Sequence, residues 1–192
     1  GEEHFRCFDF ETHPSTGANI HMLGSLYSAG FTKYDRPVQK ILNYLSKSRI
    51  DGCKWTDKWH FSPYYITSHA IIMFSRYGID LGQDSVDWMI ESQKEDGSWG
   101  YQFSTAEETA YCLQALVAWQ QAGYDVPIET ILRGYKWLKD HADQPVPPLW
   151  TAKCLYSPVL VVQSTILSAL LMVEQSILTL DSAEYEHGEC SF

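Results

Sequence analysis

The stretch QKEDGSWG, residues 93–100, places a tryptophan directly after an acidic pair and an Asp-Gly turn. Loops use Gly and Asp to reverse direction, so a large apolar Trp beside them indicates a packing role. Two other segments carry weaker copies of this pattern. ILNYLSKSRIDGCKW ends at Trp55 and YKWLKDHADQPVPPLW ends at Trp150, and each has an aromatic residue, a Leu, a polar turn and a Trp. The stretch therefore predicts a structural repeat.

Helices of two kinds alternate on either side of these turns. Four are long and apolar nearly all round, over residues 15–29, 62–77, 105–122 and 158–176. Three shorter ones are amphipathic, over residues 36–48, 84–93 and 127–141. Ser-Pro or Ser-Thr pairs mark several starts, and Gly30, Gly78 and Gly123 mark ends. No alternating strand pattern is present, so the sequence predicts an all-α fold.

The two kinds of helix predict two layers. A helix that is apolar nearly all round must be covered on both sides, which puts the long helices inside and the amphipathic ones outside. Such hairpins close on themselves as an α/α (toroid) barrel, and closure takes about six of them. The helices above make about three and a half. We expect a partial barrel in a single domain over residues 1–192, with a flexible tail over 179–192.

Composition excludes several partners and compartments. The net charge of −10 argues against nucleic acid or an anionic membrane as the main partner. Five dispersed cysteines without a CxxC pair predict reduced thiols and a cytoplasmic location. No signal peptide is visible, and no metal-ligand spacing stands out. The apolar segment 158–173 contains Gln, Ser and Thr and is shorter than the roughly 20 residues of a span, which predicts a buried helix and no transmembrane segment.

Several segments together resemble one enzyme family. The stretch 93–100 matches the QW repeat of squalene–hopene cyclases and related class II terpene cyclases, in which Gln and Trp tie an outer helix to the next turn. HPSTGANIHML (13–23), DGCKWTDKWHFSPYY (51–65), STAEETAYCLQAL (104–116) and LWTAKCLYSPVLVV (149–162) are similar to further segments of these enzymes. Order and spacing agree from about residue 5 to residue 175, and the cyclases that act on prenyl diphosphates look closer than the hopene-forming ones.

One element of the family pattern is missing. The catalytic acid of these enzymes is the central Asp of a DxDD motif, and the sequence has none. By the order of segments we expect it upstream of Gly1. The resemblance then implies the C-terminal part of a catalytic domain, inactive by itself. Its expected partner is the missing N-terminal half of the barrel or a second copy of the chain.

Three residues are candidates for the chemistry. His21 lies on the first long helix among the small residues Gly17, Ala18 and Gly24. By resemblance it orients the missing Asp and tunes its acidity, whereas the structural alternative is a core imidazole bonded to a backbone carbonyl. Asn19 is a weaker candidate on another part of the same helix. Tyr65 is a candidate for the proton route or the cavity wall.

A second group is expected to bind substrate. By resemblance Trp59, Tyr64, Trp150 and Tyr156 are wall residues that face a carbocation, although a barrel also needs aromatics simply for packing. Lys153 could bind a diphosphate as a point charge, or be an ordinary surface lysine. Mg²⁺ is expected only as a companion of a diphosphate substrate, and no other cofactor is expected. At the start of the third long helix, Glu107 and Glu108 suit the positive end of the helix dipole, while Trp55, Trp99 and Gln93 are assigned to structure.

Three functions remain open from the sequence. The first is the C-terminal portion of a class II terpene cyclase that cyclises a linear isoprenoid, a prenyl diphosphate by resemblance, after protonation. The second is the β-subunit of a protein prenyltransferase, which shares the barrel but needs Asp, Cys and His zinc ligands. The third is a non-catalytic half-barrel that binds or scaffolds another molecule.

Overall fold

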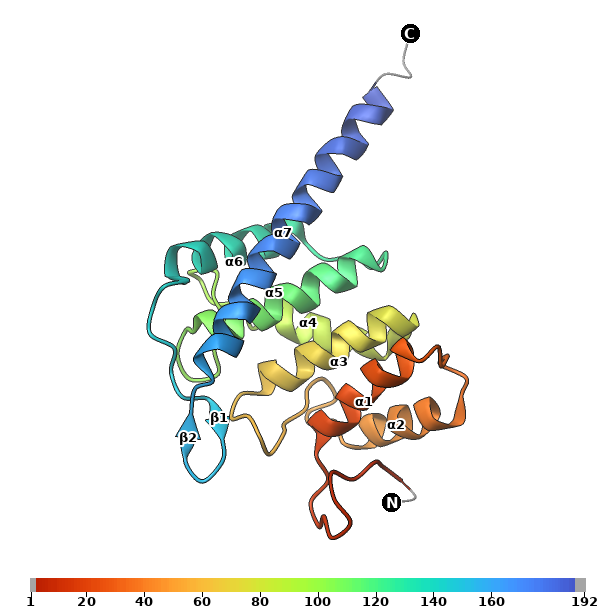
Figure 1. Ribbon diagram of the computed structural model, residues 1–192. Helices are drawn as coiled ribbons and strands as arrows, with labels where there is room; N and C mark the ends of the chain where they lie inside the picture. The colour runs from red at the N-terminus through yellow and green to blue at the C-terminus, as the bar shows by residue number, and fades with distance from the viewer. Residues whose placement is uncertain (1–2, 189–192) are drawn as a thin grey trace.

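The computed structural model describes the backbone of residues 3–188 and the side chains of residues 3–179. Helices dominate it, and the described part of the chain begins and ends at opposite ends of the molecule (Figure 1). In chain order the helices are α1 (Thr16–Ser28), α2 (Arg36–Lys47), α3 (Pro63–Tyr77), the short 3-10 helix η1 (Asp80–Gly82), α4 (Gln83–Glu91), α5 (Ala106–Gln121), α6 (Ile128–His141) and α7 (Val159–Gly188). The predicted alternation of long and short helices is confirmed.

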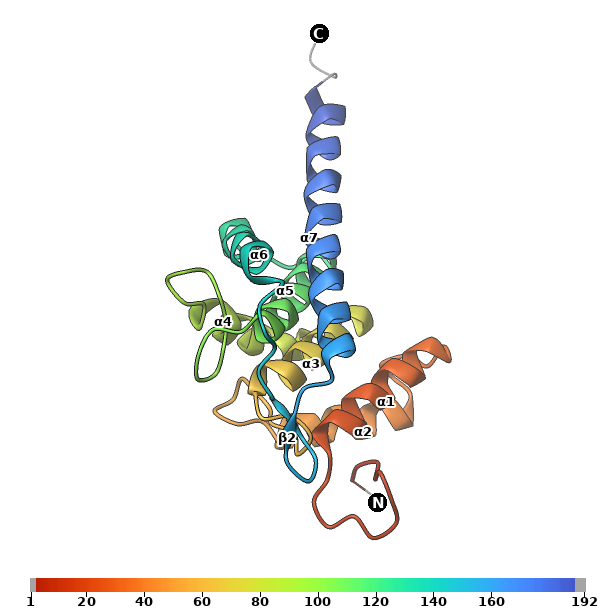
Figure 2. The same cartoon turned by 60° about the vertical axis from the view of Figure 1, so that its left-hand side comes forward.

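The helices form the two predicted layers. Helices α1, α3, α5 and α7 pack side by side in that order, and α2, α4 and α6 pack on their outer side. Figure 2 shows α4 and α6 together on one side of α3 and α5, with α7 on the other. Three hairpins and one further inner helix are therefore present, as expected for a partial α/α barrel.

Each inner helix begins at a side-chain cap. The hydroxyl oxygens of Ser15, Ser62 and Thr105 accept hydrogen bonds from backbone N–H groups in the first turns of α1, α3 and α5. Such caps satisfy donors that the helix itself leaves unpaired. Helix α3 ends where Gly78 takes the left-handed conformation that glycine adopts without strain. Local sequence thus determines where the inner helices α1, α3 and α5 begin. The loops that precede these helices lie at the same end of the inner layer.

Two tryptophans tie the layers together in the same way. Trp99 is fully buried, donates its indole N–H to the Met89 carbonyl on α4 at 2.7 Å, and donates its backbone N–H to the Thr109 hydroxyl on α5 at 3.0 Å. Trp55 bonds the Leu45 carbonyl on α2 at 2.9 Å and the Thr67 hydroxyl on α3 at 3.0 Å. We call each arrangement a tryptophan clasp. Both join an outer helix to the next inner helix, which confirms the structural assignment of the two tryptophans.

The Gln93 side chain extends the second clasp to the following outer helix. Its amide donates to the Gly97 carbonyl in its own turn and to the Thr130 carbonyl on α6, both at 2.9 Å. In the first clasp Arg49 occupies the equivalent place, six residues before its tryptophan. It donates to the Gly52 carbonyl at 2.9 Å and to the Asp84 carboxylate of α4 at 3.0 Å. In the clasp of Trp55, the guanidinium of Arg49 therefore takes the place that the glutamine side chain has in the clasp of Trp99.

Two glycines leave the space that the second clasp requires. A Cβ atom on Gly134 of α6 would lie 2.6 Å from the Trp99 ring. Gly97 has a φ of +93°, and a Cβ atom there would lie 2.7 Å from the Arg133 carbonyl oxygen. Side chains other than glycine's would push the ring or the turn away from α6.

A small β-hairpin departs from the predicted all-helical chain. Strands β1 (Trp150–Thr151) and β2 (Leu155–Tyr156) pair antiparallel, with Trp150 opposite Tyr156. Two residues per strand are too few to show an alternating pattern in the sequence. The third copy of the repeat ends in this hairpin, and Trp150 is only half-buried rather than enclosed in a clasp.

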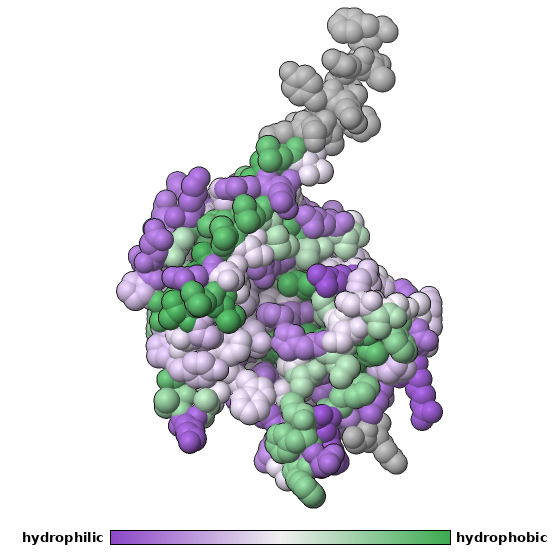
Figure 3. All heavy atoms as spheres, viewed as in Figure 1, coloured by the Kyte–Doolittle hydropathy of each residue, from purple (hydrophilic) through white to green (hydrophobic). Residues whose placement is uncertain are grey.

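The prediction of a buried last helix is wrong for α7. Among the side chains described for this helix, up to residue 179, one stripe is buried, formed by Val162, Ile166, Ala169 and Val173. The opposite side carries the exposed apolar residues Val159, Leu160, Val161, Leu167, Leu171 and Leu178. Figure 3 shows hydrophobic surface along this part of the molecule. As the last helix of the inner row, α7 has a neighbour on the side of α5 and α6 and none of the described elements on the other.

Two expectations about this end of the chain stay predictions. By length and composition Val159–Thr179 would suffice for a membrane span, but core helices of soluble proteins meet the same test. The expectation of no transmembrane segment is therefore neither supported nor overturned. The flexible tail expected over 179–192 falls mainly outside the described side chains; the backbone is helical through Gly188, and residues 189–192 lie outside the described chain.

Candidate active site on the inner face

The start of α1 is held by a carboxylate from the loop before α3. Asp57 accepts hydrogen bonds from the Ser15 hydroxyl and from the Gly17 backbone N–H, both at 3.0 Å. A Cβ atom on Gly17 would lie 2.7 Å from the Asp57 carboxylate, so glycine permits this contact. The positive end of the α1 dipole favours the anion as well. This anchor fixes the helix that carries His21.

His21 lies one turn further along α1 and faces the inner side of the layer. Its ring is exposed, and Nε2 lies 3.2 Å from the Tyr65 hydroxyl oxygen on α3. Burial of part of the ring lowers its pKa, which the charge of Asp57 opposes. The imidazole lines a cavity of about 580 Å³ between α1 and α3, together with His69 and the apolar side chains of Ile20, Ile72 and Met73.

Tyr65 is the centre of a cluster of rings. Its ring stacks on His60 at 4.5 Å between centroids and meets His69, Trp150 and Tyr111 edge-on or tilted at 4.7, 5.0 and 5.3 Å. Burial raises the pKa of Tyr65 to about 12, so the phenol keeps its proton at neutral pH. We call this set the inner-face cluster: His21, His60, Tyr65, His69, Tyr111 and Trp150.

The imidazole of His69 is neutral at physiological pH. Burial lowers its pKa to about 4, and its Nδ1 lies 2.7 Å from the Tyr65 carbonyl oxygen, to which it donates as an N–H. Its ring meets the ring of His21 edge-on at 5.2 Å. Two uncharged imidazoles thus lie side by side at the cavity, where each can exchange a hydrogen bond with a group brought by another element.

A buried glutamate, Glu107, lies behind the cluster in the first turn of α5, and its contacts go beyond the helix-dipole interpretation. Its side chain is 1% exposed, and its Oε1 accepts from Trp150 Nε1 at 2.8 Å, from Tyr111 Oη at 3.0 Å and from His60 Nε2 at 3.2 Å. The sequence indicates one of these contacts, because Glu107 and Tyr111 are four residues apart and therefore neighbours on a helix. The approach of Trp150 and His60 depends on the fold and left no such signal.

The neighbouring Glu108 has the structural role that the sequence suggests. Its carboxylate accepts from the Thr105 hydroxyl at 2.7 Å and from the Tyr101 backbone N–H at 2.8 Å. The Glu108 backbone N–H in turn donates to the Thr105 hydroxyl at 3.0 Å. These bonds with Thr105 cap the start of α5, and Glu108 takes no part in the ring cluster.

The structure brings three of the predicted site residues together, namely His21, Tyr65 and Trp150. Asn19 and Tyr64 lie elsewhere. The Asn19 amide is buried and bonds the backbone of Phe5 and Ser15, which ties the N-terminal segment to α1. The Tyr64 ring stacks on Trp88 of α4 at 4.8 Å, towards the outer layer.

The other three predicted residues lie at the loop end of the inner layer. Trp59 is 45% exposed, with the Lys58 ammonium 5.4 Å from its ring centroid. Its carbonyl accepts from the Thr151 N–H of β1 at 3.0 Å, which links it to the hairpin. Lys153 is exposed in the turn of that hairpin, and Tyr156 is 43% exposed on β2.

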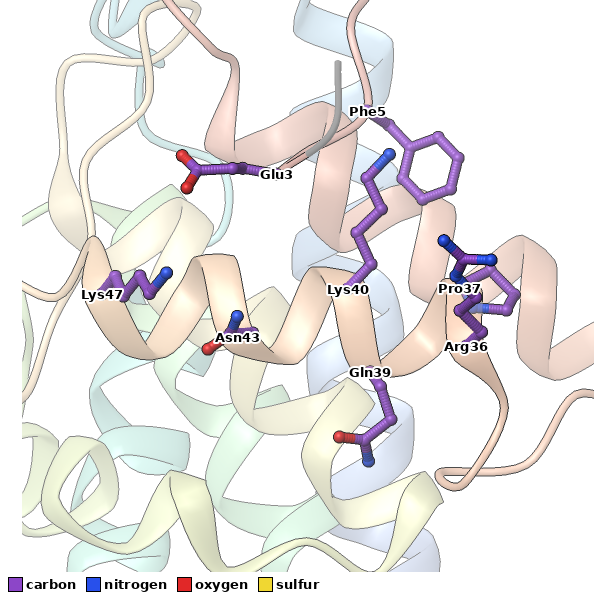
Figure 4. Close-up of a pocket in the computed structure, with 8 residues that line it drawn as sticks. All are labelled: Glu3, Phe5, Arg36, Pro37, Gln39, Lys40, Asn43 and Lys47. Atoms are coloured by element: carbon purple, nitrogen blue, oxygen red, sulfur yellow. The ribbon is translucent and has the colours of Figure 1, made fainter.

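A second hollow lies on the opposite, outer side. A groove of about 910 Å³ follows α2, and Figure 4 shows Lys40 of this helix beside Phe5 of the N-terminal segment, with Arg36 and Lys47 further along the helix. The ammonium of Lys40 lies 4.5 Å from the Phe5 ring centroid. None of the inner-face cluster lines this groove.

The inner face combines features suited to cationic hydrocarbon chemistry. It presents aromatic rings and two neutral imidazoles beside a cavity that is partly lined by apolar side chains, and these groups together can stabilise positive charge and orient an acid. Among the residues whose side chains are described, no group of three or more His, Cys, Asp or Glu side chains is arranged to hold a metal ion. The arrangement of rings and imidazoles suits acid-initiated chemistry.

Comparison with known proteins gives consistent results. The family model of the squalene-hopene cyclase C-terminal domain matches residues 4–154. The type B diterpene cyclase of Mycobacterium tuberculosis is 43% identical over 176 residues, which cover 90% of this chain and 35% of that protein. The ent-copalyl diphosphate synthase of a Streptomyces species is 36% identical over 185 residues, with coverage of 90% and 35%.

A solved structure agrees with these relatives. The ent-copalyl diphosphate synthase from Streptomyces platensis superimposes with a TM-score of 0.81 at 31% identity, over 91% of this chain and 36% of that one. The chain thus spans about a third of the length of the relatives it matches.

Proposed function

The chain belongs to the squalene-hopene cyclase C-terminal domain family, and we propose that it forms part of the catalytic domain of a class II terpene cyclase. The reaction is a protonation-initiated cyclisation of a linear isoprenoid, specifically a prenyl diphosphate. The observation that carries the proposal is the inner-face cluster, in which Tyr65 contacts both His21 and Trp150, and His21 lines a cavity. The names of the relatives, which include diterpene cyclases and copalyl diphosphate synthases, support the substrate class.

The first step of this reaction requires an acid from outside the 192 residues. An acid O–H bond breaks and its proton forms a C–H bond at the terminal alkene, leaving a carbocation that the next double bond attacks. His21 orients the acid through its free ring edge, since its other contact is the Tyr65 hydroxyl. The imidazole of His69 is uncharged, which suits this arrangement. A positive charge beside the acid would stabilise its ionised form and leave it without the proton that it has to donate.

The remaining predicted residues divide into wall and frame. Trp150 and Trp59 form the wall at the loop end, with Tyr156 opposite Trp150 across the hairpin. Lys153, exposed at the tip of that hairpin, binds the diphosphate as it projects from the cavity, and Mg²⁺ accompanies the diphosphate. Asn19 and Tyr64 support the wall indirectly, by holding α1 and α3 in place: Asn19 through the backbone of Phe5 and Ser15, and Tyr64 through the ring of Trp88.

A partner and a compartment complete the proposal. The exposed apolar side of α7 supports contact with the remainder of the barrel or with a second copy of the chain. Cys7, Cys53, Cys112 and Cys154 are free thiols, which supports a cytoplasmic location. The family match favours the cyclase over the prenyltransferase β-subunit. A non-catalytic role of the half-barrel is the alternative that turnover measurements would decide.

His21→Ala tests the proposal in a protein that carries these residues together with a DxDD-bearing segment. We expect cyclisation of geranylgeranyl diphosphate to fall on the order of 100-fold or more, because orientation of the acid is lost. Product formation is measured by mass spectrometry after dephosphorylation. His13→Ala, which alters an exposed imidazole in the N-terminal segment, serves as the control and should retain activity. Full activity of His21→Ala would remove His21 from the mechanism, and turnover by the 192 residues alone would show that the acid lies within them.

A further inference from the structure

Asp57 joins the loop before α3 to the first turn of α1. Its Oδ1 accepts hydrogen bonds from the Ser15 hydroxyl and from the Gly17 backbone N–H, both at 3.0 Å. The Ser15 hydroxyl oxygen in turn accepts from the Ala18 backbone N–H at 3.0 Å, so the carboxylate bonds to the cap of the helix itself. Ser15 is fully buried. The start of α1 is therefore fixed from another segment of the chain.

The carboxylate lies on the side of α1 that carries His21. Gly17 and His21 are four residues apart, which places them on the same face of a helix and about 6 Å apart along its axis. His21 Nε2 lies 3.2 Å from the hydroxyl oxygen of Tyr65. The segment 57–65 thus contacts α1 at two points, the first turn and the imidazole. A shift of α1 by about 0.5 Å would lengthen the second contact beyond hydrogen-bond range.

Gly17 leaves the space that this carboxylate occupies. A Cβ atom on residue 17 would lie 2.7 Å from Asp57 Oδ2 and 3.1 Å from Asp57 Cγ, and the first distance is shorter than Cβ atoms tolerate. The backbone of Gly17 is helical, a conformation that alanine adopts at least as readily as glycine. Helix propensity therefore does not explain this glycine, whereas the contact with Asp57 does.

Asp57 also acts on His21 through its charge. Burial of part of the ring lowers the pKa of His21, and the Asp57 carboxylate raises it. The other charged or titratable groups around these two residues are engaged, uncharged or further along the helix: Lys58 pairs with Glu11, His69 is uncharged at neutral pH, and Arg76 lies in the last turn of α3. Position and charge are thus two separable effects of one carboxylate.

We propose that Asp57 is a positioning residue for the cyclisation. Its carboxylate fixes the start of α1 so that His21 Nε2 stays within hydrogen-bond distance of the Tyr65 hydroxyl. Residue 17 is glycine because a side chain there would displace the carboxylate. Asp57 acts through His21 and is not a catalytic residue. The effect on turnover rests on the proposed function of His21, whereas the placement of the imidazole does not and is measurable without turnover.

The first test follows the imidazole nitrogens of His21 by ¹⁵N NMR in the 192-residue chain, with His21→Ala identifying their signals. Tyr65→Phe deletes the bond to Nε2 and gives the reference for a released ring. In the wild type we expect one tautomer to dominate. In Asp57→Ala the signals should move towards those of Tyr65→Phe, because α1 is no longer held and the bond to Tyr65 is lost.

Asp57→Asn separates position from charge. Its amide oxygen can still accept from Ser15 and Gly17, so the tautomer of His21 should stay as in the wild type. The pKa of His21, measured by titration of the same signals, should fall because the charge that raises it is gone.

Gly17→Ala tests the contact from the other side. It should displace the carboxylate and change the His21 signals as Asp57→Ala does. Added to Asp57→Ala it should cause no further change, because both substitutions remove one contact. Asp35→Ala is the matched control for the loss of a carboxylate ahead of a helix. Asp35 bonds Thr32 before α2 in the outer layer, and its loss should leave the His21 signals as in the wild type.

The second test measures turnover in a protein that carries these residues together with a DxDD-bearing segment. Asp57→Ala should lower kcat about tenfold and leave KM unchanged, because a displaced imidazole misaligns the acid without removing a contact to the substrate. Asp57→Asn should keep kcat within about threefold of the wild type, because it preserves the bonds that hold α1. Loss of the charge alone thus predicts a different order of the two variants from loss of position.

Four results would overturn the proposal. They are wild-type His21 signals in Asp57→Ala, loss of the wild-type tautomer in Asp57→Asn, additive changes in the double variant, and an unchanged kcat in Asp57→Ala. A thermal melt identifies any variant that fails to fold; if Asp57→Ala is one, Gly17→Ala supplies the same comparison.

The two proposals fail in different ways. Full activity of His21→Ala together with a displaced imidazole in Asp57→Ala would refute the proposed function of His21 and leave its placement by Asp57 standing. An inactive His21→Ala together with wild-type His21 signals in Asp57→Ala would do the reverse.

Discussion

The turn around Trp99 and the hairpin around Trp150 each bring a tryptophan to the start of α5, and the two indoles use their N–H groups differently. Trp99 donates to a main-chain carbonyl, is fully buried and joins two layers. Trp150 donates to the Glu107 carboxylate, is half-buried and packs against Tyr65 in the inner-face cluster. A main-chain partner depends on backbone position alone, whereas a carboxylate partner brings charge. The two regular copies of the repeat therefore belong to the scaffold. The third copy, which ends in the hairpin, contributes to the candidate site.

The largest effect should come from removing a clasp. Trp99→Ala deletes a fully enclosed ring and leaves the Met89 carbonyl without its donor, so we expect a loss of about 3–5 kcal/mol in the free energy of unfolding. Urea unfolding followed by circular dichroism measures it. Trp59→Ala, at a 45% exposed position, should lose less than about 1 kcal/mol. Similar losses of unfolding free energy in the two variants would show that the clasp does not contribute more to stability than an exposed tryptophan does.

The inner face, unlike the clasps, should make stability depend on pH. The pKa of His69 is about 4 in the folded chain and 6.5 when unperturbed, so protonation favours unfolding. Its contribution to stability is complete above the unfolded value and falls as the pH drops towards the folded value. Lowering the pH from about 7 to about 5 should therefore cost about 2 kcal/mol, measured by urea unfolding at each pH.

His69→Gln is the variant that isolates this contribution. It should flatten most of the pH dependence, with a remainder from His21, whose pKa burial also lowers. Glu11, whose pKa is held at about 2 by the Lys58 ammonium, affects stability only at lower pH. An unchanged slope in His69→Gln would assign the effect to another group.

The smallest effect is expected from the amide that extends the second clasp. Gln93→Ala removes hydrogen bonds to the Gly97 and Thr130 carbonyls and should cost about 1 kcal/mol, seen as a lower Tm. Gln93→Arg should recover part of the loss if the two clasps are equivalent, because Arg49 has this role in the first clasp. Gln83→Ala, which removes an exposed bond to Asp87, should be nearly neutral.

Much of the scaffold was predictable because its signals are local. The apolar pattern of the inner helices, the caps at Ser62 and Thr105, and the Asp-Gly turn before Trp99 each specify a backbone state by themselves. Arg49 was missed because its equivalence to Gln93 lies in bond geometry rather than residue type. The burial of α7 was overestimated because an apolar sequence predicts that the helix packs against other elements but does not identify those elements.

The candidate site was less predictable because its parts come from distant segments. His21 and Tyr65 are 44 residues apart, and Trp150 and Glu107 are 43 apart. Glu107 at the start of a helix has a sufficient local explanation, and only the approach of Trp150 and His60 reveals its second role. Resemblance to a family supplied His21 and Trp150, while Glu107 required the structure.

The threonine that completes each clasp lies 12 residues after Trp55 and 10 residues after Trp99. The loops between these anchors differ in length, yet the same pair of bonds holds both ends of each. Insertions and deletions in such loops can therefore accumulate without displacing the inner helix. A search for distant members of this fold should fix the tryptophan and the threonine, leave the spacing between them open, and accept arginine where glutamine is expected.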